Sequence, residues 1–202
     1  TLLDDGTHAP VILIEVLRPT GDGVRSTPSF LSAAVDRAPN VHWANAYFHH
    51  DDDWQVRRAE LVQILDDGRV SPSVPWLAHQ LLGDAHKLPS QPLQRIFYSM
   101  PWDIPEGMSA PHVDTPHGPA TLYEIRSALP ILRSEPPPDG SWLNHRIVVI
   151  GASHAASRDR FPTPLAPMPG MMIVANAIHS LRTVGVIERP ALWIILLVEV
   201  FA

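Results

Sequence analysis

Residues 146–183, RIVVIGASHAASRDRFPTPLAPMPGMMIVANAIHSLRT, decide the expected fold class. The run Arg146–Ile150 is short, apolar and β-branched, so it predicts a strand in the centre of a sheet. Residues 158–170 contain four prolines and predict a loop. Residues 171–183 are mainly apolar and predict a helix that ends before Gly185. A buried strand followed by a helix is typical of α/β proteins.

The rest of the chain shows the same alternation of strands and helices. Residues 11–14 predict a buried strand, and residues 40–48 and 55–65 predict two strands that an acidic turn joins into a β-hairpin. Helices are expected over residues 73–82 and 121–132. The sequence therefore predicts an α/β fold with a mixed β-sheet, flanking helices and one β-hairpin.

Composition limits the classes of function that the chain can have. It has 202 residues and a net charge of −6, and its 15 lysines and arginines form no cluster. Nucleic acid binding needs a basic surface, so no nucleic acid partner is expected. The absence of cysteine excludes thiol catalysis and Cys-ligated zinc. No glycine-rich phosphate-binding motif is present, and no cofactor is expected.

The loop after the predicted strand contains the residue types of a hydrolytic triad. Ser153, His154 and Asp159 lie within one short segment, but the sequence from Gly151 to Ala155 lacks the second glycine of a G-x-S-x-G nucleophile elbow. Triad residues also rarely come from a single short loop. A soluble α/β hydrolase that uses Ser153, His154 and Asp159 is therefore the alternative hypothesis, and the main hypothesis assigns no catalytic residue.

Two segments contain residue types that bind metals. One is the acidic turn His49–Asp53, and the other contains His112, Asp114 and His117. Neighbouring residues of one turn seldom converge on a single ion, so we interpret both segments as solvated turns and expect no metal.

Four residues are candidates for binding a ligand or for organising the loop: Gly151, Asp159, Thr163 and Asn176. Asp159 lies between Arg158 and Arg160, which favours an ionised carboxylate at the surface; alternatively, it accepts backbone N–H groups and shapes the loop. Asn176 lies in an apolar run, where a buried amide must be hydrogen-bonded. The simplest partner is the backbone of residues 159–169. Bracing of the helix by the loop is the preferred interpretation, with direct ligand contact as the alternative.

Residues 190–202 form an apolar run with one glutamate. The run predicts either an amphipathic helix packed on the core or the first part of a transmembrane helix, which needs about 20 apolar residues. Trp193, near the start of the run, suits the interface of a membrane.

The motifs of residues 147–178 resemble, in order and spacing, the second type of CHASE domain. These motifs are Ile147–Ser153, Asp159, Thr163–Leu165, Met168–Gly170 and Ala175–Ile178. Asp53 followed by Val56 and Arg57 resembles the family's D-G-x-V-R strand, but Trp54-Gln55 replaces the glycine. The resemblance extends roughly from Val11 to Val186, so Thr1 is expected to lie inside the domain.

CHASE domains are extracytoplasmic sensors attached to cyclases, histidine kinases and Ser/Thr kinases. The resemblance therefore implies that residues 1–189 are an N-terminally truncated sensor domain on the periplasmic or outer side of a bacterial plasma membrane. Residues 190–202 would begin a transmembrane helix, and a cytoplasmic output enzyme would follow residue 202. The fragment itself would be non-catalytic and would perceive an unknown small-molecule or protein signal. The helix at residues 171–183 would couple it to the membrane, and family analogy favours a homodimer.

Overall fold

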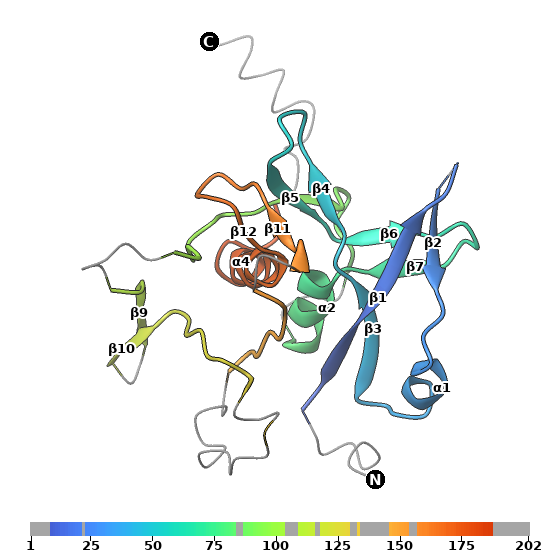
Figure 1. The fold of residues 1–202 in the computed structure, drawn as a ribbon, viewed down its shortest axis with the longest axis horizontal. Helices are drawn as coiled ribbons and strands as arrows, with labels where there is room; N and C mark the ends of the chain where they lie inside the picture. Colours follow the sequence, from blue (N-terminus) through green and yellow to red (C-terminus); the bar gives the residue numbers. More distant parts are fainter. Residues whose placement is uncertain are drawn as a thin grey trace. The chain divides into compact units, whose positions relative to one another are not determined.

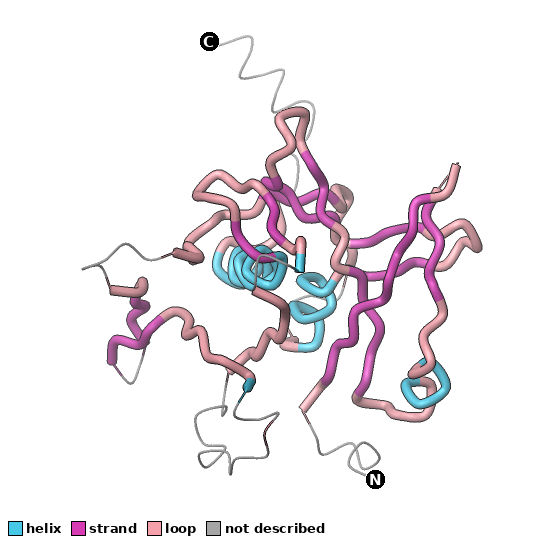
Figure 2. Tube along the Cα trace, viewed as in Figure 1, coloured by secondary structure: helices cyan, strands magenta, loops and turns pink. Residues whose placement is uncertain are grey.

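The structure is a computed structural model that describes residues 9–21, 23–83, 87–103, 109–115, 118–129, 133, 146–153 and 157–187 (Figure 1). Its elements confirm a mixed α/β fold. The described strands form five small sheets, so the expected single mixed sheet with one hairpin is wrong. Figure 2 shows these short strands in magenta, separated by long loops.

The chain forms two compact units. The first unit consists of residues 1–97 and 177–202, and the second of residues 98–176. Helix α4 (Gly170–Thr183) contributes its start to the second unit and its end to the first.

A three-stranded sheet in the first unit contains the only parallel pair among the described strands. β1 (Val11–Pro19) pairs antiparallel with β2 (Val24–Thr27) and parallel with β3 (Val41–Asn45), which confirms the strand predicted at residues 11–14. The one-turn helix α1 (Ser32–Val35) leads into a small core. The members of this core are Val35, Ala38 and Val41, with Leu13 and Trp43 packed against them.

The predicted hairpin is confirmed in part. Its first strand, expected at residues 40–48, is wrong for residues 41–45, which form β3 and pair with β1, and the hairpin strand begins at Phe48 and includes two residues of the expected turn. β4 (Phe48–His50) pairs antiparallel with β5 (Val56–Glu60), and β8 (Leu93–Arg95) pairs with the other edge of β5. The segment after β5 starts a second hairpin, in which β6 (Val62–Ile64) pairs with β7 (Val70–Pro72). Residues 55–65 therefore belong to two sheets and not to one strand.

Helix α2 (Val74–Leu81) confirms the helix predicted at residues 73–82 and shows its expected start and end. The Ser73 side chain accepts a hydrogen bond from the Trp76 N–H at 3.4 Å, and proline occupies the first turn. Gly83 follows the helix with a φ of 82°, which glycine adopts without strain. The helix packs through Trp76 against Leu61 and Leu181, all of them buried.

The second unit differs more from the prediction. Its described strands are β9 (His112–Thr115), β10 (Gly118–Thr121), β11 (Arg160–Phe161) and β12 (Met168–Pro169). They form two separate two-stranded hairpins. The helix predicted at residues 121–132 is wrong for residues 121–128, which are not helical, and residues 130–132 lie outside the described residues.

The predicted central strand at Arg146–Ile150 is wrong as well. They have no strand partner among the described residues, and Ile147, Val148 and Ile150 are 43%, 53% and 80% exposed. A β-branched run fits a strand only where a neighbouring strand pairs with it, because strand propensity depends mainly on tertiary context. The same holds for the expected helix at residues 121–132, where Ile125 and Leu129 are exposed and bury no apolar face.

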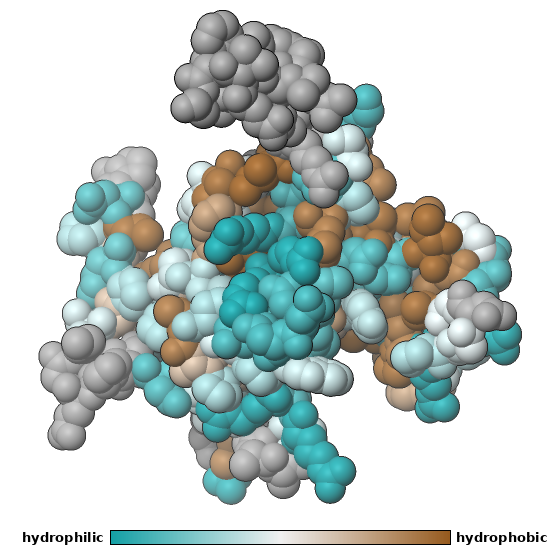
Figure 3. Space-filling model, turned by 90° about the horizontal axis from the view of Figure 1, so that it is seen from above, coloured by the Kyte–Doolittle hydropathy of each residue, from teal (hydrophilic) through white to brown (hydrophobic). Residues whose placement is uncertain are grey.

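Apolar side chains also reach the surface of the first unit. The most exposed include Ile14, Val16, Phe30, Ile64 and Val70. Figure 3 shows apolar surface in brown beside hydrophilic surface in teal on the face that it draws.

Of the helices that the structure describes, none is long and apolar enough to cross a membrane. The start of a transmembrane helix predicted at residues 190–202 lies outside the described residues.

Candidate functional site

The candidate site is built around helix α4, and Asn176 is its most tightly held polar side chain. Asn176 is fully buried. Its Oδ1 accepts hydrogen bonds from the N–H groups of Ser99 and Met100, both at 2.9 Å. Its Nδ2 donates to the carbonyl oxygens of Met100 at 2.9 Å and Met172 at 2.8 Å. Two donors and two acceptor positions are the full capacity of an amide side chain, so Asn176 braces the fold and has none left for a ligand.

The partner of Asn176 differs from the expected one. The sequence pointed to the backbone of residues 159–169, whereas the structure places the backbone of Ser99 and Met100 against the amide. From the expected segment, only the Met168 sulfur comes close, at 4.0 Å from Nδ2. The Ser99–Met100 segment lies far away in sequence, so no local pattern could have predicted it.

Ser180 forms a second brace one helical turn after Asn176 and was not among the candidates. Its buried Oγ accepts a hydrogen bond from the Phe97 N–H at 3.1 Å and lies 3.4 Å from the Arg95 carbonyl oxygen, to which it donates. The spacing of four residues puts both side chains on one face of the helix. A second polar residue at this spacing in an apolar run was the signal that could have identified Ser180.

The first turn of α4 holds Asp159. The Gly170 N–H donates to the Asp159 carbonyl oxygen at 3.1 Å. A β-carbon at Gly170 would lie 2.6 Å from Asp159 Oδ1, so the half-buried carboxylate packs directly on this glycine. Burial raises the pKa of Asp159, and a hydrogen bond from the Gly170 backbone partly opposes that rise. Asp159 thus lies at a helix N-terminus, where a carboxylate is favoured, rather than free at the surface.

Thr163 and Gly151 shape the loop that leads to α4. Thr163 is buried, and its Oγ1 donates to the Ala166 carbonyl oxygen at 2.6 Å and accepts from the Ala166 N–H at 3.4 Å. Such a side-chain bond closes a turn. A β-carbon at Gly151 would lie 2.7 Å from the Met171 β-carbon, so this glycine allows close approach to the first turn of α4. Gly151 and Asp159 therefore lie against the first turn of α4, and Thr163 closes a turn in the loop before it.

The residues of the hydrolase hypothesis gain no support from these contacts. Ser153 is exposed, His154 lies outside the described residues, and the Asp159 carboxylate packs on Gly170. In the part of the chain that the structure describes, no three His, Asp or Glu side chains form a group that could hold a metal ion. His112 and Asp114 lie in β9, and His117 lies outside the described residues.

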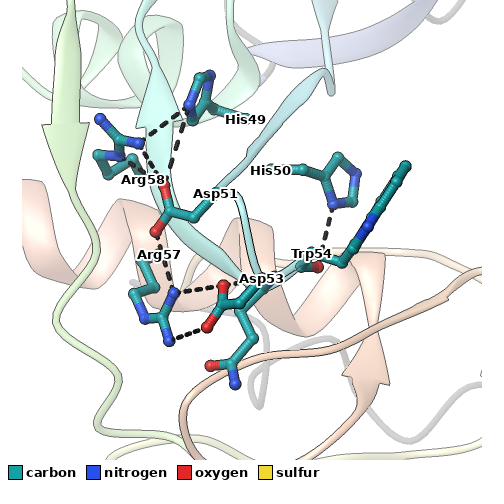
Figure 4. A network of polar contacts seen from close by, with 8 residues as sticks. His49, His50, Asp51, Asp53, Trp54, Arg57 and Arg58 are labelled. Atoms are coloured by element: carbon teal, nitrogen blue, oxygen red, sulfur yellow. Dashed lines mark hydrogen bonds and ion pairs between the residues drawn. The ribbon is translucent and has the colours of Figure 1, made fainter.

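The acidic turn between β4 and β5 forms an ionic network, drawn in Figure 4. Arg57 makes two hydrogen bonds to Asp53, at 2.7 and 2.6 Å, and a third to Asp51 at 3.2 Å. Arg58 binds the other oxygen of Asp51 and also contacts His49. The hydrogen bonds from Arg58 lower the pKa of Asp51, and those from Arg57 lower the pKa of Asp53 to about 2. The arginines thus occupy the carboxylates that a metal would need.

Trp54 takes the glycine position of this turn. Its φ is 63°, in the left-handed region that favours glycine. The Trp54 N–H donates to the Asp51 carbonyl oxygen at 2.8 Å. The centre of the Trp54 ring lies 6.1 Å from that of the His50 ring, and Trp54 is 73% exposed. The turn therefore keeps a glycine-like backbone conformation although glycine is replaced.

Comparison with known proteins decides the family. The model of the CHASE2 domain matches residues 7–202. The chain belongs to the CHASE2 family. CHASE2 domains are extracytoplasmic sensory domains of membrane proteins, which supports a sensory role. No curated protein and no solved structure matched the chain.

Proposed function

We propose that this CHASE2 domain is the sensor of a bacterial membrane signalling protein and that helix α4 transmits the signal. The observation that carries the proposal is the pair of buried polar side chains on one face of α4. Asn176 binds the backbone of Ser99 and Met100, and Ser180 binds the backbone of Arg95 and Phe97. A helix held by a few directional bonds has defined positions, and two discrete positions are what a switch needs.

The segment around the start of α4 is the proposed place where a signal acts. Asp159 packs on Gly170, and Gly151 packs on Met171, so a displacement of this segment acts directly on the first turn of the helix. A small molecule or partner protein shifts such an equilibrium only through different affinities for the two positions. In this proposal Gly151, Asp159 and Thr163 set the loop conformation that the signal recognises.

The proposed topology follows the family. The domain faces the periplasm or the cell exterior, a transmembrane helix begins near Pro190, and a cyclase, histidine kinase or Ser/Thr kinase follows in the cytoplasm. A homodimer would let two α4 helices move together. The test is the gene sequence that follows the codon for Ala202. Hydrophobic spans and an output enzyme there support the proposal, and a soluble ending would contradict it.

The role of α4 is tested in the full-length protein. We expect Ser180→Ala to change the activity of the output enzyme, because the change frees the Phe97 N–H while it leaves the four bonds of Asn176 in place. Thr183→Ala is the matched control, since Thr183 lies on the same helix but is exposed and bonds only within it, to His179. Output that is equal in both variants and in the unaltered protein, with equal protein levels, would remove α4 from the mechanism.

A further inference from the structure

A polar hollow lies in the first unit. It has a volume of about 430 Å³ and is lined by Thr20, Gly21, Arg25 and Asp66. Ligand pockets commonly measure about 300 to 1,000 Å³, so the hollow can hold a small metabolite. Thr20 and Gly21 follow β1, Arg25 lies in β2, and Asp66 lies in the turn between β6 and β7.

Asp66 forms one side of the hollow and is fixed in place. Its N–H donates to the Val24 carbonyl oxygen at 2.9 Å, and its Oδ2 accepts a hydrogen bond from Thr20 Oγ1 at 2.9 Å. A β-carbon at Gly23 would overlap Asp66 Oδ1, so the close approach of this oxygen requires glycine at position 23. Among the described residues, none donates a hydrogen bond to Oδ1, and the carboxylate as a whole lines the hollow.

Arg25 also lines the hollow. Its side chain is 75% exposed, and its Nε lies 3.9 Å from Asp66 Oδ2. That distance is too long for a hydrogen bond. Within the described ranges, Arg25 makes no other ion pair. The hollow thus holds an exposed guanidinium next to a carboxylate, with no direct hydrogen bond between the two groups.

We infer that this hollow binds a small zwitterion with one carboxylate and one ammonium group, such as an α-amino acid. The carboxylate would accept two parallel hydrogen bonds from the Arg25 guanidinium, the geometry that arginine favours. The ammonium group would donate to the Asp66 carboxylate. A simple anion is repelled by Asp66 and a simple cation by Arg25, so the pair selects a ligand that carries both charges. This site is independent of the proposed coupling through α4, and either can fail alone.

The test is calorimetric titration of the full chain with L-alanine, L-glutamate and L-arginine. Propionate and ethylammonium, which carry one charge each, are the matched ligands. We expect at least one amino acid to bind, and both single-charge ligands to bind at least about tenfold more weakly. Arg25→Gln and Asp66→Asn should each weaken amino acid binding by about tenfold or more. Arg69→Gln should leave binding unchanged, because that exposed arginine pairs with Asp67 outside the hollow.

Two results would overturn the inference. One is that none of the three amino acids binds, and the other is that Arg25→Gln binds them as tightly as the unaltered protein. Arg25 is exposed, so its replacement should leave the melting temperature unchanged, and this variant stays informative even if Asp66→Asn loosens the two connections. Activity of the output enzyme in the Ser180 variant is a separate readout that neither result affects.

Discussion

The two polar networks of this domain follow opposite designs. On α4, Asn176 and Ser180 are buried and uncharged. They bind mainly backbone groups of residues 95–100, and Asn176 also binds one carbonyl of the helix itself. At the β4–β5 turn, Asp51, Asp53 and Arg57 are charged and partly exposed, and they bind mainly one another. The first network joins segments far apart in sequence, whereas the second closes a single turn.

This difference shows that the number of hydrogen bonds alone does not tell which network contributes more to the stability of the fold. An exposed ion pair contributes about 0 to 1 kcal/mol, because water and salt screen the charges. A buried backbone group that loses its partner costs about 1 to 3 kcal/mol. The few neutral bonds of α4 should therefore matter more for stability than the many ionic bonds of the turn.

The largest expected effect is that of Asn176→Leu. The change leaves the N–H groups of Ser99 and Met100 and the Met100 carbonyl oxygen without their partner. We expect the free energy of unfolding to fall by about 3 to 5 kcal/mol. Urea denaturation measures it, with Thr183→Ala as the control on the same helix. A loss below about 1 kcal/mol would mean that water replaces the amide without cost.

Ser180→Ala should have the next largest effect. It leaves the Phe97 N–H unsatisfied in a part-buried position, and we expect a loss of about 1 to 2 kcal/mol. Hydrogen exchange should become faster at the Phe97 amide while the Met100 amide, which Asn176 still holds, stays protected. Equal acceleration at both amides would show that the two braces form one cooperative unit.

Acid should reduce the contribution of the ionic network to stability and leave that of the buried network of Asn176 and Ser180 unchanged. The pKa of Asp53 is lowered from 3.8 to about 2, and that of Asp51 is lowered too. A carboxyl with a lowered pKa in the folded state adds stability above its unfolded pKa, and this contribution is lost as pH falls through the folded value. We expect a loss between about pH 4 and pH 2.

Arg57→Gln is the variant that tests the acid effect. It should flatten stability over this pH range and also its dependence on salt, because Arg57 is the main cause of the Asp53 shift. Asn176→Leu should lower stability equally at every pH, since the amide does not titrate. Unfolding curves at several pH values compare the two, and a pH profile unchanged by Arg57→Gln would rule out the ionic network as its source.

The smallest expected effect is that of Trp54→Gly. The change relieves a left-handed φ of 63° but gives the unfolded chain more freedom. We expect the relieved strain and the added entropy of the unfolded chain nearly to cancel. The free energy of unfolding should then change by less than about 0.5 kcal/mol. Thermal unfolding measures it. A loss above about 1 kcal/mol would show that the contact between the Trp54 and His50 rings stabilises the turn.

Local signals predicted the parts of this fold that depend on neighbours in sequence. Ser73, Pro75 and Gly83 mark the two ends of α2, and the apolar run after Gly170 marks α4. Residues 146–150 carry an equally clear strand signal, but a strand also needs a partner, and that choice is tertiary.

The candidate site also has features that the local sequence predicts and features that depend on tertiary contacts. Burial of Asn176 follows from its apolar surroundings in the helix, and it is confirmed. Its partners do not follow, because Met100 lies 76 residues earlier in the chain. The turn at Thr163 depends on a short segment with distinctive residues, whereas only the structure shows that Asp159 packs against Gly170 at the start of α4.

The bond between Asn176 and Met100 also bears on the order of folding. It closes a loop of 76 residues, and the entropy lost in closing a loop grows with its length. The hairpins of the first unit can form before that closure, so docking of residues 99–100 on α4 is expected late, after the main barrier. Asn176 should then have a low φ-value: its replacement would speed unfolding and leave the folding rate almost unchanged. In that case, the lifetime of the folded sensor depends on one amide side chain.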